Sequence, residues 1–433
     1  MRYLLEAFVA RQWTQQDVNR AAAFFSTHMA PTYSDFPFPK DLMSTVVQQN
    51  NALQATFLSS WRLYLKARVF MHTVQCFRYP TTVATLSRRA KDRIEAAFER
   101  SVEGGVGSPL LGSRLHDFGF RGCTCVEQSV LGGVAHLLNF DGSDTLSAAY
   151  YAQFYLNDGE PVAMSIPASE HSVMTAWRTE REAMENMIEH FGSGILACVM
   201  DSYDYVQALA ELLPAVAQKQ VGKGGFLILR PDSGDPVEAV LLALEAAEKV
   251  FGVEVNSLGY KVPKSCGVIQ GDGINIQTLD KILQAVMAQG FSAQAVAFGM
   301  GGGLLQRLNR DTMSFATKLS HIVYADGIEA DIMKLPKSDP LKFSLPGVMA
   351  VKMVGGVPTA FPAEGGHVTP EENMLHVVWD HGPVQVEWEK FTRLRQQVDR
   401  QWHALPKTAD VLSQPLKDKV EAVTARLRQP PES

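Results

Sequence analysis

The sequence predicts an α/β protein with a parallel α/β barrel and a second, α+β domain. A short apolar run, a polar turn and a helical pattern alternate repeatedly between residues 115 and 311, as parallel strands connected by helices do. About seven such units in succession favour a closed barrel over an open sheet. Polar residues follow most of the apolar runs, at the strand ends where such barrels carry their sites.

The chain has 433 residues, enough for two domains. We expect residues 80–325 to form the barrel that carries the active site. The α+β domain is expected to combine residues 1–79, its N-terminal part, with residues 326–433, its C-terminal part. The boundary at residue 326 follows from the regular alternation, which loosens after Asp326.

The elements follow in order along the chain. Helices are expected in residues 1–29 and from Pro80 to Glu103, whereas residues 44–78 show no clean period. Asp235 followed by Pro236 marks the start of another helix. The strand-like runs of the barrel are Leu115–Arg121, Ala135–Phe140, Val162–Ile166, Ile195–Met200, Phe226–Leu229, Val268–Ile269 and Ala295–Phe298. The C-terminal part is expected to hold strands at Val348–Val354 and Val384–Trp388 and helices at Trp388–Trp402 and Lys417–Leu427.

Composition argues against several classes of protein. The formal net charge is −6 and no dense run of Lys and Arg occurs, which argues against a nucleic-acid platform. No apolar run approaches the length of a membrane span, about 20 residues. The five cysteines are few and unpatterned, which indicates a reducing compartment and no structural zinc site. We therefore expect a cytoplasmic protein without nucleic-acid or membrane partners, and we assign no metal ligand.

Two consecutive strands end in glycine-rich turns within Val268–Asp311. The first turn contains Gly271 and the second contains Gly301–Gly303, and each precedes a helical pattern, the second starting at Leu304. Such turns present backbone N–H groups and a positive helix end to an anion, most often phosphate. The alternative is that both are only tight strand-to-helix turns. The pairing of the two turns, with arginines after the second, favours phosphate binding.

Charged residues follow the other strands, namely Arg121, Asp144, His171, Asp201, Arg230 and Asp232. Arg230 and Asp232 supply a guanidinium for a phosphate or ring and a carboxylate for a hydroxyl or Mg²⁺, although an ion pair within the loop explains them equally well. A lone histidine such as His171 is more often structural than catalytic. Asp144 also suits a turn or helix cap.

Six segments together resemble the nicotinamide phosphoribosyltransferases: LHDFGFRG, SIPASEHSVMTAW, DSYDYVQAL, LILRPDSGDP, VIQGDG and AFGMGGGLLQRLNRD. They occur in that family's order, and the likeness spans roughly residues 79–345. The resemblance implies an irregular parallel α/β barrel of the type II phosphoribosyltransferase kind, and a homodimer with sites at the subunit interface. It also implies transfer of the phosphoribosyl group of 5-phosphoribosyl 1-pyrophosphate to nicotinamide, which gives nicotinamide mononucleotide and pyrophosphate in NAD salvage.

Carried over motif by motif, the resemblance assigns one group of residues to nicotinamide. Phe118 would stack on one face of the ring, and Arg121 would lie beside the ring and the pyrophosphate. Asp144 would accept a hydrogen bond from the carboxamide. Its negative charge would disfavour nicotinate, whose own carboxylate would face it.

A second group would bind the phosphorylated substrate. His171 would be phosphorylated by ATP, the activator, and the phosphohistidine would organise Mg²⁺ and pyrophosphate. His171, Asp201 and Asp232 are the expected catalytic residues. The expected ligands of the phosphoribosyl group are Arg230 and Asp232 for pyrophosphate and ribose, Gly271 and Asp272 for the ribose hydroxyls, and Gly301, Gly302 and Arg310 for the 5′-phosphate.

The first residues of this sequence resemble a helix that in the family lies some way into the domain. We therefore expect an N-terminally shortened member. The family's Asp-Ser-Tyr-Lys-x-x-His pattern, whose tyrosine closes the ring pocket from the partner subunit, does not occur in the sequence. Two alternatives stay open: a nicotinate phosphoribosyltransferase, and a catalytically impaired relative that binds nucleotides.

Overall fold

The computed structural model describes residues 69–309, 311–316, 318–338, 342–377, 388–406 and 410–428, together with Gln16, Asn19, Arg20 and Ala23. For residues 69–77 it describes the backbone alone. The chain divides into two compact units, Met1–Phe315 and Ala316–Ser433. Apart from those four positions, the helices expected in residues 1–29 lie outside the described residues. Of the strand expected at Val384–Trp388 only Trp388 is described, and it is not in a strand.

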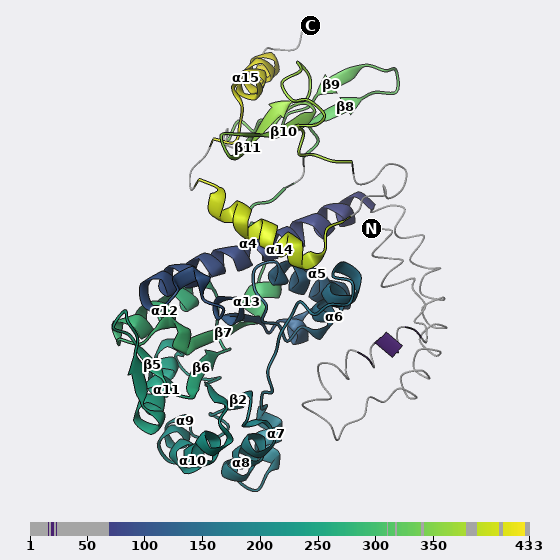
Figure 1. The fold of residues 1–433 in the computed structure, drawn as a ribbon. Helices are drawn as coiled ribbons and strands as arrows, with labels where there is room; N and C mark the ends of the chain where they lie inside the picture. The colour runs from purple at the N-terminus through teal and green to yellow at the C-terminus, as the bar shows by residue number, and fades with distance from the viewer. Residues whose placement is uncertain are drawn as a thin grey trace. The chain divides into compact units, whose positions relative to one another are not determined.

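Five parallel strands form the sheet of the first unit, in the order β1-β7-β6-β3-β2. Of these strands, β7, β6 and β2 are labelled in Figure 1. Their registers pair Leu115 with Phe298, Val268 with Val296 and Leu229 with Val268, all in parallel. The predicted α/β class with a parallel sheet is therefore confirmed. The strands are β1 (Leu115–Asp117), β2 (Ile195–Val199), β3 (Phe226–Arg230), β6 (Cys266–Gln270) and β7 (Val296–Met300).

Isolated parallel bridges connect the two outer strands of this sheet through two further segments. Asp117 at the end of β1 bridges Ser143, Gly142 bridges Met164, and Ala168 bridges Ala197 of β2. Two backbone hydrogen bonds hold each junction, such as the 2.7 Å bond from the N–H of Met164 to the oxygen of Asp141. A continuous path of pairings therefore leads from β1 back to β2.

Two of the expected strands are wrong. Ala135–Leu137, the first half of the run Ala135–Phe140, is the last turn of helix α5 (Val126–Leu137), because its apolar residues complete the buried face of that helix. Val162–Ile166 forms only the bridge at Met164. Pro161 and Pro167 flank that run, and proline lacks the N–H group that a strand ladder needs.

Helices surround the sheet. Helix α4 runs from Val69 to Ser101 and contains Pro80, so the expected start at Pro80 is wrong. Proline is tolerated there although it removes one backbone hydrogen bond. Helix α11 begins at Pro236 as predicted, with the carboxylate of Asp235 accepting the N–H groups of Val237 and Glu238. The remaining long helices are α6 (Leu146–Leu156), α8 (Glu180–Phe191), α10 (Leu213–Lys223) and α12 (Ile276–Ala288).

Side chains of the strands alternate between two faces, as the pleat requires. One set, which includes Leu196, Leu229 and Phe298, packs with the helices in the main core. The other set forms a small separate cluster of Ala197, Ile269 and Ala297, against which Phe118, Ile166 and Ile228 pack. We call this second set the inner face of the sheet.

The second unit contains antiparallel pairs and helices. Strand β8 (His321–Val323) pairs with β9 (Glu329–Asp331), and β10 (Met349–Val354) pairs with β11 (Val357–Pro362). Strand β10 confirms the strand expected at 348–354. Helices α14 (Phe391–Ala404) and α15 (Gln414–Arg428) occur where helices were predicted. The union of residues 1–79 with 326–433 in one domain stays a prediction. No helix in the described part of the chain has the length and apolar character that crossing a membrane requires.

Candidate active site

The predicted polar residues meet at one edge of the sheet. Because the five strands are parallel, their carboxyl ends lie at the same edge, where barrel enzymes place their chemistry. Asp144 and His171 follow the two bridging segments that complete the path of pairings. The residues at the strand ends are Phe118 after β1, Asp201 after β2, Arg230 at the end of β3, Gly271 and Asp272 after β6, and Gly301 and Gly302 after β7.

The ring of Phe118 lies on the inner face, against the cluster of Ala197, Ile269 and Ala297. Gly271 and Gly299 follow Ile269 and Ala297 by two residues and therefore share their orientation. A Cβ atom added to Gly299 would lie 2.1 Å from Cε2 of Phe118, and one added to Gly271 would lie 3.0 Å from it. The ring of Phe118 thus occupies space that only glycine leaves free.

A cavity of about 490 Å³ opens beside this ring, lined by Phe118, Phe120, Arg121 and Asp144. Oδ1 of Asp144 accepts a hydrogen bond from the hydroxyl of Ser165. The N–H of Asp144 donates to the carbonyl oxygen of Asp117 at 2.9 Å. Aromatic rings, one guanidinium and one carboxylate together suit a flat ring that carries a hydrogen-bond donor.

His171 begins helix α7 (His171–Ala176), whose N-cap is the side chain of Glu170. Nε2 of His171 lies 3.0 Å from Oδ1 of Asp201, and Nδ1 lies 3.8 Å from Oδ2 of Asp232. The histidine side chain is 36% exposed, whereas that of Asp201 is 4% exposed. A buried carboxylate therefore orients an imidazole that solvent and ligands can reach.

The two carboxyl groups beside His171 have pKa values shifted in opposite directions. Burial would raise the pKa of Asp201, but hydrogen bonds from Ser233, His171 and the N–H of Asp232 outweigh it and lower that pKa. Asp201 is therefore ionised at neutral pH, and Nε2 of His171 carries the proton that it accepts. Burial raises the pKa of Asp232, against the opposing effect of Arg230. Neighbouring acids with opposed pKa shifts are typical of functional sites.

Gly271 joins the cavity beside Phe118 to the group around His171. A Cβ atom on Gly271 would lie 3.0 Å from the ring of Phe118 and 3.9 Å from Oδ1 of Asp232. Buried polar atoms are normally hydrogen-bonded. In the described part of the chain, Oγ of Ser202, Nε of Arg230 and Oε1 of Gln270 are buried at this edge without such a partner. A ligand bound at this edge would supply hydrogen-bond partners for these three atoms.

The second glycine turn differs from its expectation. Helix α13 begins at Gly302 rather than Leu304 and is only four residues long, with Gly301 as its N-cap. Gly301 lies against the main chain of Phe118, since an added Cβ atom would be 3.0 Å from the oxygen of Phe118. Arg310 lies outside the described residues.

The sequence model of the nicotinate phosphoribosyltransferase (NAPRTase) family matches residues 113–421, a range that includes the whole edge described above. The chain belongs to this family. It is 41% identical over 320 residues to the nicotinamide phosphoribosyltransferase of Xanthomonas campestris pv. campestris (strain 8004), an alignment that covers 72% of this chain and 67% of that protein.

A second family relative is the nicotinamide phosphoribosyltransferase of Acinetobacter baylyi (strain ATCC 33305 / BD413 / ADP1), 30% identical over 312 residues, which cover 66% of this chain and 61% of that protein. The chain thus spans about two thirds of the length of these relatives. Among solved structures, the nicotinate-nucleotide pyrophosphorylase of Pyrococcus furiosus aligns with 75% of this chain and 70% of its own, at 15% identity and a TM-score of 0.47. That likeness is too distant to support an inference.

Three further residues contribute to the site of this family member, although the sequence patterns do not predict a role for them. Ser233 donates its hydroxyl to Asp201, Gly299 makes room for Phe118, and Asp117 donates and accepts backbone bonds beneath Asp144. For Gly299 a signal existed, because the alternation of the strand places it on the face that also carries Ala297. For Ser233 and Asp117 no spacing rule distinguishes them from ordinary turn residues.

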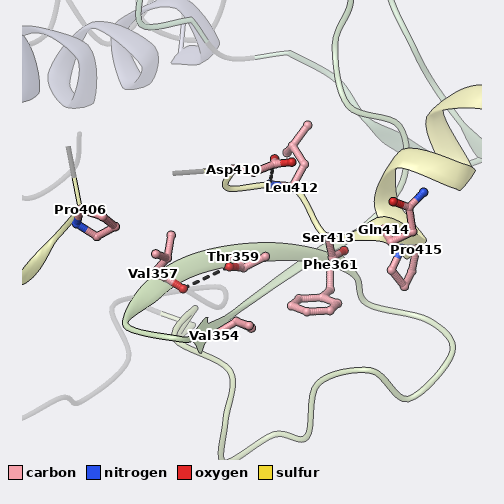
Figure 2. A pocket seen from close by; sticks show the side chains of 10 residues that line it. All are labelled: Val354, Val357, Thr359, Phe361, Pro406, Asp410, Leu412, Ser413, Gln414 and Pro415. Carbon is pink, nitrogen blue, oxygen red and sulfur yellow. Dashed lines mark hydrogen bonds between the residues drawn. The ribbon is translucent and has the colours of Figure 1, made fainter. Parts of the chain in front are cut away.

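A second cavity, of about 470 Å³, lies within the second unit (Figure 2). Val354, Val357, Phe361 and Leu412 give it a largely apolar lining, and the hydroxyl of Thr359 is directed to the oxygen of Val357 at 3.1 Å. None of the predicted site residues lines it. The predicted site residues gather instead at the sheet edge of the first unit, which is therefore the candidate site.

Proposed function

We propose that this chain transfers the phosphoribosyl group of 5-phosphoribosyl 1-pyrophosphate to nicotinamide, giving nicotinamide mononucleotide and pyrophosphate. One juxtaposition supports it above all: the cavity of Phe118, Arg121 and Asp144 adjoins the His171–Asp201 pair across Gly271. Relatives named nicotinamide phosphoribosyltransferase support the same activity.

On the nicotinamide side, Phe118 supplies an aromatic face for the pyridine ring, and Arg121 lies beside it. Asp144 accepts the N–H of the carboxamide, while Ser165 holds one of its oxygens in place. A carboxylate at this position repels the carboxylate of nicotinate, so the cavity discriminates by charge rather than by shape.

On the phosphoribosyl side, Arg230 and Asp232 bind pyrophosphate and ribose, Gly271 and Asp272 the ribose hydroxyls, and Gly301, Gly302 and Arg310 the 5′-phosphate. The bond from ribose C1 to pyrophosphate breaks as the ring nitrogen of nicotinamide approaches C1, through a transition state that resembles an oxocarbenium ion. The residues at the edge position the two substrates and stabilise the separating charges.

His171 accepts a phosphoryl group from ATP, with ADP as the other product. Because Asp201 accepts the N–H of Nε2, the lone pair of the neutral imidazole lies on Nδ1, which we expect to be the phosphorylated nitrogen. The described residues contain no cluster of three or more His, Cys, Asp or Glu side chains suited to a metal ion. Mg²⁺ is commonly held by one or two carboxylates together with substrate phosphates, and we expect it to arrive with the pyrophosphate.

The path of pairings from β1 to β2 supports an irregular barrel as the finer description of the fold. We further propose that the chain is a homodimer with its sites at the subunit interface, in a cytoplasmic setting. The oligomeric state is measured by light scattering of the purified chain.

The test of the activity uses the purified chain with nicotinamide, 5-phosphoribosyl 1-pyrophosphate, Mg²⁺ and ATP, and detects the mononucleotide by chromatography. Formation of nicotinamide mononucleotide is the expected result. A higher rate with nicotinate would assign the chain to the nicotinate phosphoribosyltransferases instead. Binding of the mononucleotide without turnover would make it a catalytically impaired relative.

A further inference from the structure

Asp117 is a fully buried residue that precedes Phe118 in the chain and is bonded through its carbonyl oxygen to the N–H of Asp144, and both Phe118 and Asp144 line the cavity. Burial raises its pKa to about 6, although the hydrogen bond from the N–H of Gly119 acts against that shift. No described Lys, Arg or His side chain forms an ion pair with it. Burying an acid without a basic partner is costly, so Asp117 has a role that an apolar residue could not fill.

Three hydrogen bonds connect Asp117 and the next residue to both sides of the cavity. Oδ1 of Asp117 accepts the N–H of Gly119 at 2.7 Å, which fixes the turn that follows Phe118. The carbonyl oxygen of Asp117 accepts the N–H of Asp144 at 2.9 Å, and the N–H of Phe118 donates to the oxygen of Met300 at 3.1 Å. One residue thus holds the backbone that carries Phe118 and the backbone that carries Asp144.

Helix α5 closes over the carboxyl group of Asp117. A Cβ atom added to Gly133 of α5 would lie 3.1 Å from Oδ2 of Asp117 and 2.4 Å from Cβ of Ala148. The helices α5 and α6 therefore approach closely at this point and keep the side chain of Asp117 beside Gly119.

We infer that Asp117 is a positioning residue for the nicotinamide pocket, an inference that rests on the proposed function. Its side chain sets the turn from Phe118 into the short 3₁₀ helix η4 (Phe120–Gly122), which carries Arg121. Its main chain sets Asp144. Asp117 touches no substrate in this arrangement and acts only through the residues on either side of the pocket.

The test compares Asp117→Ala, which loses the acceptor for Gly119, with Asp117→Asn, which keeps an oxygen there. The KM for nicotinamide is expected to rise about tenfold in Asp117→Ala, the effect of losing one hydrogen bond to a charged group. The KM for 5-phosphoribosyl 1-pyrophosphate should rise much less, and Asp117→Asn should restore the wild-type KM for nicotinamide. Equal changes in both KM values, or failure of Asn to restore, would overturn the inference.

Ser101→Ala is the matched control, because Ser101 is also fully buried and donates to the oxygen of Ala97 at 2.9 Å on helix α4. It is expected to lower the melting temperature without changing either KM. If the wild-type chain forms no mononucleotide, the proposed function fails, but the positioning role of Asp117 is still tested by amide hydrogen exchange. Amide hydrogen exchange in residues 118–122 should then be faster in Asp117→Ala than in Asp117→Asn, and equal rates in the two variants would overturn it.

Discussion

Nε2 of His171 donates a hydrogen bond to Oδ1 of Asp201 over 3.0 Å, and of the two side chains only the histidine is substantially exposed. Further hydrogen bonds, from Ser233 and from the N–H of Asp232, reach the other oxygen of the same aspartate. These hydrogen bonds fix the side chain of Asp201 without a ligand, and Asp201 in turn fixes the orientation of the His171 imidazole.

Asp201→Asn is expected to reduce phosphorylation of His171 by ATP about 10- to 100-fold, the usual effect of losing a carboxylate that orients a histidine. The amide presents either an oxygen or an N–H group to Nε2, so one tautomer is no longer enforced. Incorporation of labelled phosphate from ATP measures the effect. Glu254→Gln, which alters a 75% exposed side chain paired with Lys264, is the control and should leave labelling unchanged. Full labelling of Asp201→Asn would remove the orienting role from Asp201.

Asp144→Asn is expected to lower the preference for nicotinamide over nicotinate by about tenfold or more, because it removes the like charge that opposes nicotinate. The measurement is the ratio of kcat/KM for the two substrates. Ser165→Ala, which removes the hydroxyl bound to Asp144 but keeps the charge, should change that ratio much less. An unchanged ratio in Asp144→Asn would mean that selectivity resides elsewhere.

Gly299→Ala is expected to lower the free energy of unfolding by about 1–3 kcal/mol through overpacking against Phe118. It should also raise the KM for nicotinamide, since the ring of Phe118 must move away from the inner face. Gly222→Ala is the control, because Gly222 lies in helix α10 with no atom within 4 Å of an added Cβ. That change should be neutral or stabilising by up to about 1 kcal/mol. Similar effects of the two substitutions would contradict the close packing.

The stability of the chain is expected to depend on pH through Asp117. Its pKa is about 6 when folded against a usual value of 3.8, so the unfolded chain releases this proton first as the pH rises. The contribution of Asp117 to the free energy of unfolding is therefore fully present below about pH 4. It is lost as the pH rises through 6, by about 3 kcal/mol in total. The difference in denaturant midpoint between wild type and Asp117→Asn, measured from pH 4 to 8, isolates this change. A constant difference would show that Asp117 titrates normally.

The sequence predicts the strands and the order of charged strand ends because each depends on local patterns. Asp235 and Pro236 define a helix start, and the apolar runs of β2, β3, β6 and β7 are short and bounded by turns. The run Ala135–Phe140 was misassigned because a buried apolar segment looks alike in a strand and in the last turn of a helix.

The finer geometry of the site depends on contacts between residues far apart in the chain. Gly299 and Phe118 are distant in sequence, and their contact exists only because β1 and β7 are neighbours. The same holds for Ser233 with Asp201, which requires that β2 and β3 pair. The spacing of residues within one segment therefore does not predict such pairs. Resemblance to a family implies the roles of individual residues, but it does not give the distances between them.

The path that returns from β1 to β2 consists of single bridges with two hydrogen bonds at each junction, whereas β2 and β3 pair over five consecutive residues. Short ladders open more readily than long ones. Amide exchange is therefore expected to be faster in residues 142–144 and 164–169 than in β3 and β6. Asp144 belongs to the first segment and His171 follows the second, so substrates that bind both residues would restrain the most easily opened part of the path of pairings. Substrate binding would then appear partly as slower amide exchange along the two bridging segments.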